Sequence, residues 1–242
     1  MIRHSACIMR SWMQLSWVVR DGKADQRPPS ILGAEEDAKS FIMGMNSMAL
    51  RLVDGVVEDL QKARVFPLKD GASFIDVGGA SGTYTEAFLN VLPGSKATIF
   101  DLPVAVELAK RRFGDHPLKD RVSIVQGDFC KDDLPEGFDM AWVSAIIHSM
   151  NREQSRALYA KILKALKPGG LILIRDFIMS RDHTRPVDGT LFGINMLVNN
   201  ATGRVFSYAE IREDLEAAGY VDVFQVSDVP TMCAMAAGKK PA

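Results

Sequence analysis

The chain has 242 residues, of which 47% are apolar and 24% charged, as in ordinary soluble globular proteins. This length exceeds one typical domain of roughly 150 residues but is short for two complete ones. Lysine and arginine (29) nearly balance aspartate and glutamate (30), so the net charge of −1 provides no overall positive field for nucleic acid or an anionic membrane. The composition excludes disorder, collagen and coiled coil, and disfavours a nucleic-acid partner.

The cysteines and the apolar stretches bear on the cellular environment. Cys7, Cys130 and Cys233 are far apart and form no C-x-x-C pair, so the sequence shows neither a zinc cluster nor a disulfide framework, and no metal site is expected. No stretch approaches the roughly 20 apolar residues that span a bilayer. We therefore expect a cytoplasmic protein that does not bind to a membrane.

The first part of the chain is predicted to be helical. Apolar residues at steps of three and four predict a helix from Cys7 to Val19, and Pro28-Pro29 predicts a linker over Asp25 to Ser30. A second apolar stripe predicts a long helix over residues 35–62. Its methionines are interpreted either as adaptable core residues or as the floor of a ligand pocket: Met43, Met45 and Met48.

After Asp70-Gly71, short apolar runs alternate with amphipathic helices. Strands are predicted at 73–77, 97–100, 122–125, 140–144 and 171–174, and helices at about 84–91, 104–113, 152–166 and 208–218. This alternation is typical of βαβ units, in which a parallel sheet is covered on both faces. Two final runs, 221–226 and 232–236, are joined by a short turn and predict an antiparallel hairpin at one sheet edge.

A strand, a glycine-rich turn and a helix follow one another between Phe74 and Thr83. Gly78 and Gly79 would let a ligand approach the backbone at the carboxyl end of the strand. The dinucleotide fingerprint fails, because Ala80 and Thr83 occupy glycine positions. Asp76, just before the glycines, would repel a pyrophosphate but tolerate a cationic ligand that carries an amino-acid moiety. S-adenosylmethionine is such a ligand.

Two further carboxylates follow the next two strands on the same edge. Asp101 stands where an acid can accept hydrogen bonds from both ribose hydroxyls. Asp128 stands where a carboxylate can meet the adenine amino group, and Phe129 would line the ring. A single such aspartate more often caps a turn. Three at successive strand ends, together with the glycine loop, favour a cofactor site.

The series IDVGGASG, FDLP, GDF, an aliphatic strand ending in His148, and LKPGG resembles the S-adenosylmethionine-dependent O-methyltransferases of the caffeic-acid, acetylserotonin and bacterial antibiotic type, over about residues 40 to 237. The resemblance implies a Rossmann-like class I methyltransferase fold of the α/β class. Its mostly parallel seven-stranded sheet would have an antiparallel C-terminal hairpin and helices on both faces, with additional N-terminal helices. The implied cofactor contacts are Gly78, Gly79, Asp101, Leu102, Asp128 and Phe129.

The sequence departs from the family pattern at two cofactor positions. Ala80 replaces the third glycine of the usual run, and we expect its one extra methyl group to be tolerated. Ser144 stands where plant members carry a lysine four residues before the histidine. We expect Ser144 to line the cofactor site with a weaker contact to the adenine.

The transfer of a methyl group to a phenol requires a base, and His148 ends the fourth strand on the cofactor edge. A phenol of pKa about 10 and an imidazole of pKa about 6.5 differ by roughly 5 kcal/mol, which alignment of the reacting groups can supply. Asp176 ends the adjacent strand and would orient the imidazole, directly or through water. The family places its catalytic histidine and a supporting glutamate at these positions. For His148 the competing interpretation is a core histidine, and for Asp176 an ion pair with Arg175.

The segment from Gly193 to Arg204 resembles the family's substrate-lining helix and the loop after it. The resemblance implies that Met196 clamps the acceptor ring and that Asn200 contacts a ring substituent. A second acidic residue that flanks the histidine in plant enzymes is Val205 here, which favours a more apolar acceptor.

The N-terminal segment Ser11 to Lys23 resembles only the last helix of the family's N-terminal dimerisation domain. We therefore expect residues 1–30 to be a remnant of that domain with its linker, and residues 31–242 to be the catalytic domain. A homodimer is expected to be weakened by the missing part. Trp12 and Trp17 would form an adhesive apolar patch unless they pack on the domain or on a second chain.

These observations predict O-methylation of a small aromatic or phenolic acceptor, with S-adenosyl-L-methionine as cofactor. Three alternatives remain open at this point: carbon or nitrogen methylation on the same scaffold, a catalytically silent cofactor-binding remnant, and a nicotinamide oxidoreductase.

Overall fold

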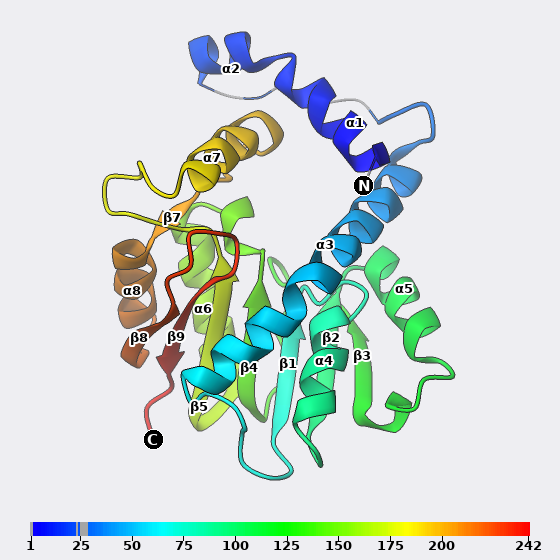
Figure 1. Ribbon diagram of the computed structural model, residues 1–242, viewed down its shortest axis with the longest axis vertical. Helices are drawn as coiled ribbons and strands as arrows, with labels where there is room; N and C mark the ends of the chain where they lie inside the picture. Colours follow the sequence, from blue (N-terminus) through cyan, green and yellow to red (C-terminus); the bar gives the residue numbers. More distant parts are fainter. Residues whose placement is uncertain (1, 23, 25–28) are drawn as a thin grey trace.

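The computed structural model describes residues 2–22, 24 and 29–242 (Figure 1). Seven strands form one sheet in the order β3-β2-β1-β4-β5-β9-β8. Strands β1 to β5 run parallel, whereas β9 is antiparallel to both β5 and β8. The predicted α/β fold with a C-terminal hairpin at one edge is confirmed. The strand bounds are β1 Ser73–Val77, β2 Lys96–Asp101, β3 Val122–Gln126, β4 Phe138–Ser144, β5 Leu166–Asp176, β8 Val221–Ser227 and β9 Ala234–Lys239.

Helices cover both faces of this sheet, as strand–helix alternation predicts. One face carries α3 (Ala34–Lys62), α4 (Thr83–Val91) and α5 (Pro103–Phe113), with the short η1 turn (Lys119–Arg121) before β3. The opposite face carries α6 (Arg152–Ala165) and α8 (Tyr208–Ala217). Asn151 and Ser207 begin these last two helices with complete capping boxes.

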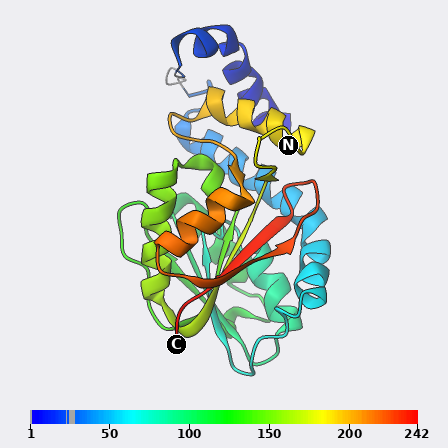
Figure 2. The same ribbon diagram turned by 90° about the vertical axis from the view of Figure 1, so that its left-hand side faces the viewer.

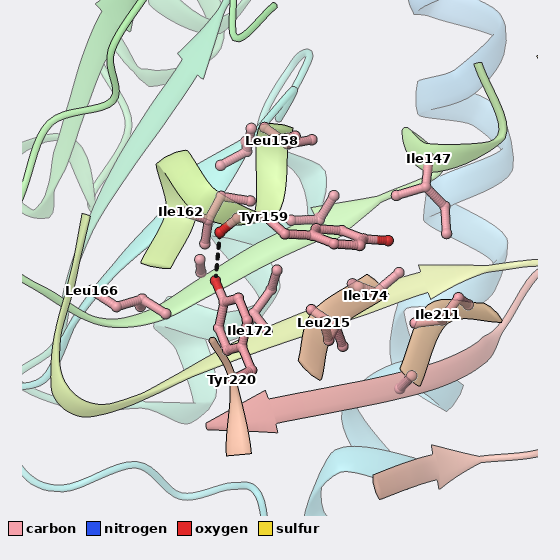
Figure 3. Packing of buried hydrophobic residues seen from close by; sticks show 14 of the residues in the cluster. Ile147, Leu158, Tyr159, Ile162, Leu166, Ile172, Ile174, Ile211, Leu215 and Tyr220 are labelled. Carbon is pink, nitrogen blue, oxygen red and sulfur yellow. Dashed lines mark hydrogen bonds between the residues drawn. The ribbon is translucent and has the colours of Figure 1, made fainter. Parts of the chain in front are cut away.

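Alternate residues of each strand point into two separate cores. On the α6 and α8 side, Ile172 and Ile174 pack with Leu158, Ile162 and neighbouring side chains (Figure 3). The buried Tyr220 hydroxyl donates a hydrogen bond to the Tyr159 carbonyl at 3.1 Å. On the other face of the sheet, Trp142 of β4 and Leu173 of β5 pack against α3 and α4. Both faces of the sheet are therefore buried, so a ligand-binding site can form only at the edges where the strands begin and end.

The N-terminal segment forms two helices, α1 (Ile2–Trp12) and α2 (Leu15–Asp21), where one continuous helix was predicted. The helix breaks at Met13 and Gln14, where the Gln14 amide donates to the Ser11 carbonyl in a tight turn. The turn lets both helices follow α7 (Val187–Asn199), on which they lie in both views (Figures 1 and 2). The predicted linker over Asp25 to Ser30 lies largely outside the described residues.

Smaller differences from the predictions have local causes. β9 begins at Ala234 rather than Met232, because Thr231 is held in the preceding turn by hydrogen bonds to Val229 and Cys233. The two-residue strands β6 (Ile178–Met179) and β7 (Phe206–Ser207) pair in parallel and are too short to show a sequence pattern. Among the described residues, no helix has the length and apolarity to cross a membrane.

Candidate active site

The candidate site lies at the carboxyl edge of the parallel strands, where the chain order of the sheet reverses. Strand β1 lies between β2 and β4, so successive connections lead away from it in opposite directions. In open α/β sheets this switch point is where ligands bind. The loop Gly78–Gly82 leaves β1 at this point and leads into α4. The Gly78 amide donates to the Phe100 carbonyl at 2.8 Å, which fixes the loop to the end of β2.

The loop has little room for side chains. A Cβ atom at Gly78 would collide with the Ile146 side chain, and one at Gly79 would lie 2.7 Å from the Asp76 Cγ. Gly78 and Gly82 also adopt left-handed φ angles of 71° and 79°. Ala80 has a φ of 50° as well, so the methyl group that we expected to be tolerated occupies a strained conformation.

The carboxylates of Asp76 and Asp101 lie against the glycine loop. Asp76 is buried and accepts a hydrogen bond from Thr85 Oγ1 at 2.7 Å. Burial raises the pKa of Asp76 to about 7, with a smaller contribution from the nearby Asp101 charge. Asp101 accepts hydrogen bonds from the Ala80 and Leu102 amides, one on each carboxylate oxygen, at 2.7 Å each. Burial raises the pKa of Asp101 above its usual range, although these amide bonds act in the opposite direction.

Asp128 caps its own turn at the end of β3. Its Oδ1 accepts from the Cys130 amide at 2.9 Å, and its Oδ2 pairs with Lys131 Nζ at 3.0 Å. The Lys131 ammonium and the Cys130 amide hold the pKa of Asp128 below its usual range. The neighbouring Phe129 ring packs on the core and lies 3.6 Å from the Cβ position of Gly78. Phe129 therefore lies beside the glycine loop, while the Asp128 carboxylate is held within its turn.

Ser144 ends β4 and is paired in register with Arg175 on β5. Arg175 Nη1 donates to Ser144 Oγ at 2.6 Å, and the guanidinium lies 5.2 Å from the centre of the Tyr84 ring. Burial raises the pKa of Tyr84 to about 12. Arg175 therefore turns to Ser144 and Tyr84, and not to its neighbour Asp176 as the competing interpretation supposed.

His148 and Asp176 are in direct contact. The prediction that His148 ends the fourth strand is wrong, because β4 ends at Ser144 and His148 follows it within the short η2 turn (Ile147–Ser149). The Nδ1 atom of His148 lies 2.9 Å from both carboxylate oxygens of Asp176. The side chain of Asp176 is only 1% exposed, and that of His148 is 14% exposed. Asp176 also accepts from the Phe177 amide at 2.8 Å, which fixes the carboxylate. The expected contact is direct, without a bridging water.

The loop that follows α7 closes against His148. The Arg204 amide donates to the His148 carbonyl at 2.9 Å, and a Cβ atom at Gly203 would lie 2.9 Å from the same oxygen. Within α7 and this loop, Asn200 Nδ2 lies 3.7 Å from the sulfur of the buried Met196. The structure therefore brings the two predicted substrate residues together, next to the loop that contacts His148.

Sequence reasoning missed Asn46 and Phe192. Asn46 Oδ1, from α3, accepts hydrogen bonds from Ser81 Oγ at 2.9 Å and Thr83 Oγ1 at 2.6 Å, so it braces the glycine loop. Phe192, from α7, meets the His148 ring edge-on with centroids 4.8 Å apart. A polar residue within the apolar stripe of 35–62 was the available signal for Asn46. No sequence signal distinguished Phe192 from a core residue.

Comparisons with known proteins agree with this architecture. A family model described as an O-methyltransferase domain matches residues 14–221. Acetylserotonin O-methyltransferase from Gallus gallus is 30% identical over 92% of this chain, and the tetracenomycin polyketide synthesis 8-O-methyl transferase from Streptomyces glaucescens is 30% identical over 95%. The chain spans 65% of the length of the chicken protein and 67% of the Streptomyces protein.

Solved structures share the fold. Human N-acetylserotonin methyltransferase, solved with S-adenosylmethionine, matches 96% of this chain and 67% of its own with a TM-score of 0.82 at 23% identity. An O-methyltransferase family 2 protein from Planctomyces limnophilus, solved with apigenin, matches 87% of this chain and 63% of its own with a TM-score of 0.73 at 26% identity. The family model, which covers most of the chain, decides the assignment: this protein belongs to the O-methyltransferase domain family.

Proposed function

We propose that this protein transfers a methyl group from S-adenosylmethionine to a hydroxyl group of a small aromatic acceptor, with His148 as general base. The observation that carries this proposal is the direct contact between His148 and the buried Asp176 at the carboxyl edge of the sheet. His148 lies two residues after Ile146, whose side chain packs on Gly78 of the glycine loop. The cofactor, when bound, supplies the methyl group already activated as a sulfonium. The protein must then bind the acceptor, orient it and remove its proton.

The residues around the glycine loop fit such a cofactor. Each Asp101 oxygen accepts one hydrogen bond within the protein, which leaves lone pairs for ribose hydroxyls. Because Gly78 and Gly79 lack side chains, Ile146 and Asp76 pack directly against the loop, and Phe129 offers an apolar face beside Gly78. Asp128 would have to accept the adenine amino group while it caps its turn, and its lone pairs allow this. The human relative solved with S-adenosylmethionine supports the same assignment.

The histidine geometry favours proton transfer through Nε2. Because Nδ1 faces a carboxylate that only accepts hydrogen bonds, Asp176 favours the tautomer with the proton on Nδ1. Nε2 then has a lone pair for the acceptor hydroxyl proton. The imidazolium that forms is stabilised by the Asp176 carboxylate. Deprotonation leaves the acceptor oxygen as the nucleophile for the methyl carbon.

The surroundings of His148 favour an aromatic acceptor. Phe192 packs against the imidazole, and Phe177 packs on Phe192 with ring centres 5.0 Å apart. Met196 adds a polarisable sulfur and Asn200 one amide group. Aromatic rings stack well in such surroundings. The apigenin in the Planctomyces relative and the naphthoate in the name of a Streptomyces sahachiroi relative belong to the same chemical class.

We also propose that residues 31–242 form the catalytic unit and that residues 1–30 correspond to the end of a dimerisation domain with its linker. We propose in addition that a second copy of the chain covers the outer face of α1 and α2. Met9 on α1, Met13 in the turn between the two helices and Trp17 on α2 are 67%, 77% and 58% exposed. Large exposed apolar side chains of this kind mark association surfaces.

Titration calorimetry tests the cofactor assignment. We expect S-adenosylmethionine and S-adenosylhomocysteine to bind with one-to-one stoichiometry and NADH to give no binding heat. Heat with NADH and none with the sulfur-containing ligands would instead favour an oxidoreductase. Product analysis then separates oxygen from carbon or nitrogen methylation, because only an O-methyl ether loses the acceptor's phenolic proton signal.

A further inference from the structure

Arg175 is a buried cation for which the described residues provide no anionic partner. The residue is 4% exposed, and in the described part of the chain no carboxylate lies within ion-pair distance of its guanidinium. It donates from Nη1 to Ser144 Oγ, a neutral hydroxyl, and its Nε is buried without a hydrogen bond. Buried guanidinium groups are costly unless they are paired and fully hydrogen-bonded, so an unpaired one requires an explanation.

The surroundings of Arg175 contain two further buried polar groups without a hydrogen-bond partner among the described residues, the Tyr84 hydroxyl and Trp142 Nε1. Both Trp142 and Arg175 lie against the Tyr84 ring. The indole and guanidinium nitrogens can only donate. The cluster of Tyr84, Trp142, Ser144 and Arg175, which we call the donor cluster, therefore has more donors than acceptors and no negative charge.

The position of the donor cluster suggests what supplies the missing charge. In the sheet, β5 follows β4 on the side of β1 opposite to β2 and β3. If Asp128 and Asp101, at the ends of β3 and β2, hold the adenosine of the cofactor, its amino-acid end extends past the glycine loop towards β4 and β5. Ser144 and Arg175 stand in register at those two strand ends. The guanidinium also lies 5.2 Å from the centre of the Tyr84 ring, and Tyr84 belongs to the first turn of α4, which directly follows the glycine loop.

We propose that Arg175, together with Ser144, binds the α-carboxylate of the methionine moiety of S-adenosylmethionine. The inference rests on the proposed function and adds a specific residue to it. A carboxylate matches the planar guanidinium with two parallel hydrogen bonds and neutralises its charge. The Ser144 hydroxyl, which now accepts from Nη1, can turn to donate to the same carboxylate. Binding would therefore satisfy donors that the protein leaves unpaired.

Calorimetry with two ligands tests this assignment. S-adenosylhomocysteine carries the α-carboxylate, whereas its decarboxylated analogue keeps the adenosine, the sulfur and the amine. We expect the wild-type protein to bind S-adenosylhomocysteine at least tenfold more tightly than the analogue. Arg175→Gln should remove this preference by weakening only the first ligand, and Arg175→Lys should retain part of it because the charge remains. Arg212→Gln, which removes a surface arginine paired with Glu216, serves as control and should change neither Kd.

The possible results separate the two proposals. Absence of S-adenosylhomocysteine binding to the wild-type protein overturns the proposed function, and this inference with it. Equal affinity of the wild-type protein for both ligands overturns the inference alone and needs no variant to fold. The inference also fails if folded Arg175→Gln still prefers S-adenosylhomocysteine to the decarboxylated analogue, a result that would make a buried water the partner of the donor cluster. It fails as well if Arg175→Gln binds a carboxylated phenol more weakly than the wild type does but binds S-adenosylhomocysteine equally well.

Discussion

Ala80 is the residue of the glycine loop whose conformation conflicts with its side chain. At a φ of 50°, an alanine is strained by roughly 1 kcal/mol relative to glycine. Ala80→Gly should therefore raise the free energy of unfolding by about 1 kcal/mol, measured by urea denaturation. The reverse change at Gly82 is a matched control, because a Cβ atom there would lie 2.6 Å from Phe113. Gly82→Ala should be clearly destabilising. A loss of stability in Ala80→Gly would show that the strain is absent.

Asp76 makes stability depend on pH. The pKa of this buried carboxyl is raised from 3.8 to about 7 in the folded protein, so between these values the folded state binds more protons than the unfolded state. Its contribution to stability is present below pH 4 and is lost as the pH rises through 7. The free energy of unfolding of Asp76→Asn, relative to that of the wild type, should therefore rise by an amount on the order of 2–3 kcal/mol between pH 5 and pH 8.

Unfolding of both proteins in denaturant across this pH range provides the measurement. The amide oxygen that Asp76→Asn introduces can still accept from Thr85 Oγ1, so the variant removes the charge and keeps the hydrogen bond. A difference between the two proteins that stays constant with pH would show that Asp76 titrates normally.

At the level of single residues, the sequence predicted the strand ends well and side-chain contacts poorly. The pairing of His148 with Asp176 could be expected because adjacent parallel strands end at one edge. That Arg175 turns away from Asp176 towards Tyr84 depends on the side of β5 that each residue occupies and on the packing of α4. The bracing of the loop by Asn46 depends on the path of α3 over the sheet, which local sequence does not encode.

Among the elements, α7 depends most on a distant part of the chain. Trp12 Nε1 donates to Asn195 Oδ1 at 2.9 Å, and Gln14 Nε2 lies 3.4 Å from the Val198 carbonyl. Trp12→Phe keeps an aromatic ring and removes the hydrogen bond, which contributes about 1 kcal/mol. We expect amide hydrogen exchange in α7 to become about fivefold faster, with β1 and β4 unchanged. Trp17→Phe, on the exposed side of α2, is the control. Unchanged exchange in α7 would exclude this role of Trp12.

The elements themselves were largely predictable because their apolar periods are clear. The strands β1 to β5 and the helices α3 to α6 agree with the predictions to within a few residues, except for the longer β5. The break between α1 and α2 was missed because apolar residues continue through Met13, and only packing on α7 makes a turn at Gln14 favourable. The β6–β7 pair was missed because a strand of two residues is too short to show an alternation of apolar and polar residues.

For the molecule as a whole, the outer face of α1 and α2 predicts self-association. Met9 on α1, Met13 in the turn between the helices and Trp17 on α2 are all more than half exposed. Trp17→Glu places a charge in the centre of this face and should shift a concentration-dependent dimer towards monomer in light scattering coupled to size exclusion. Arg212→Gln should leave the dimer unchanged. The proposal fails if wild type and Trp17→Glu have the same monomeric mass at every concentration.

Transfer of a labelled methyl group from S-adenosylmethionine to a panel of small phenols is the most direct test of the proposed function. We expect the wild-type protein to label at least one phenol on oxygen and His148→Ala to lose this activity by about 10²- to 10⁴-fold while it still binds S-adenosylhomocysteine. Asp176→Asn should reduce the rate similarly and change its pH profile, because an amide does not stabilise the imidazolium. Full activity of His148→Ala, or no label on any phenol with wild-type protein that binds the cofactor, would contradict the account.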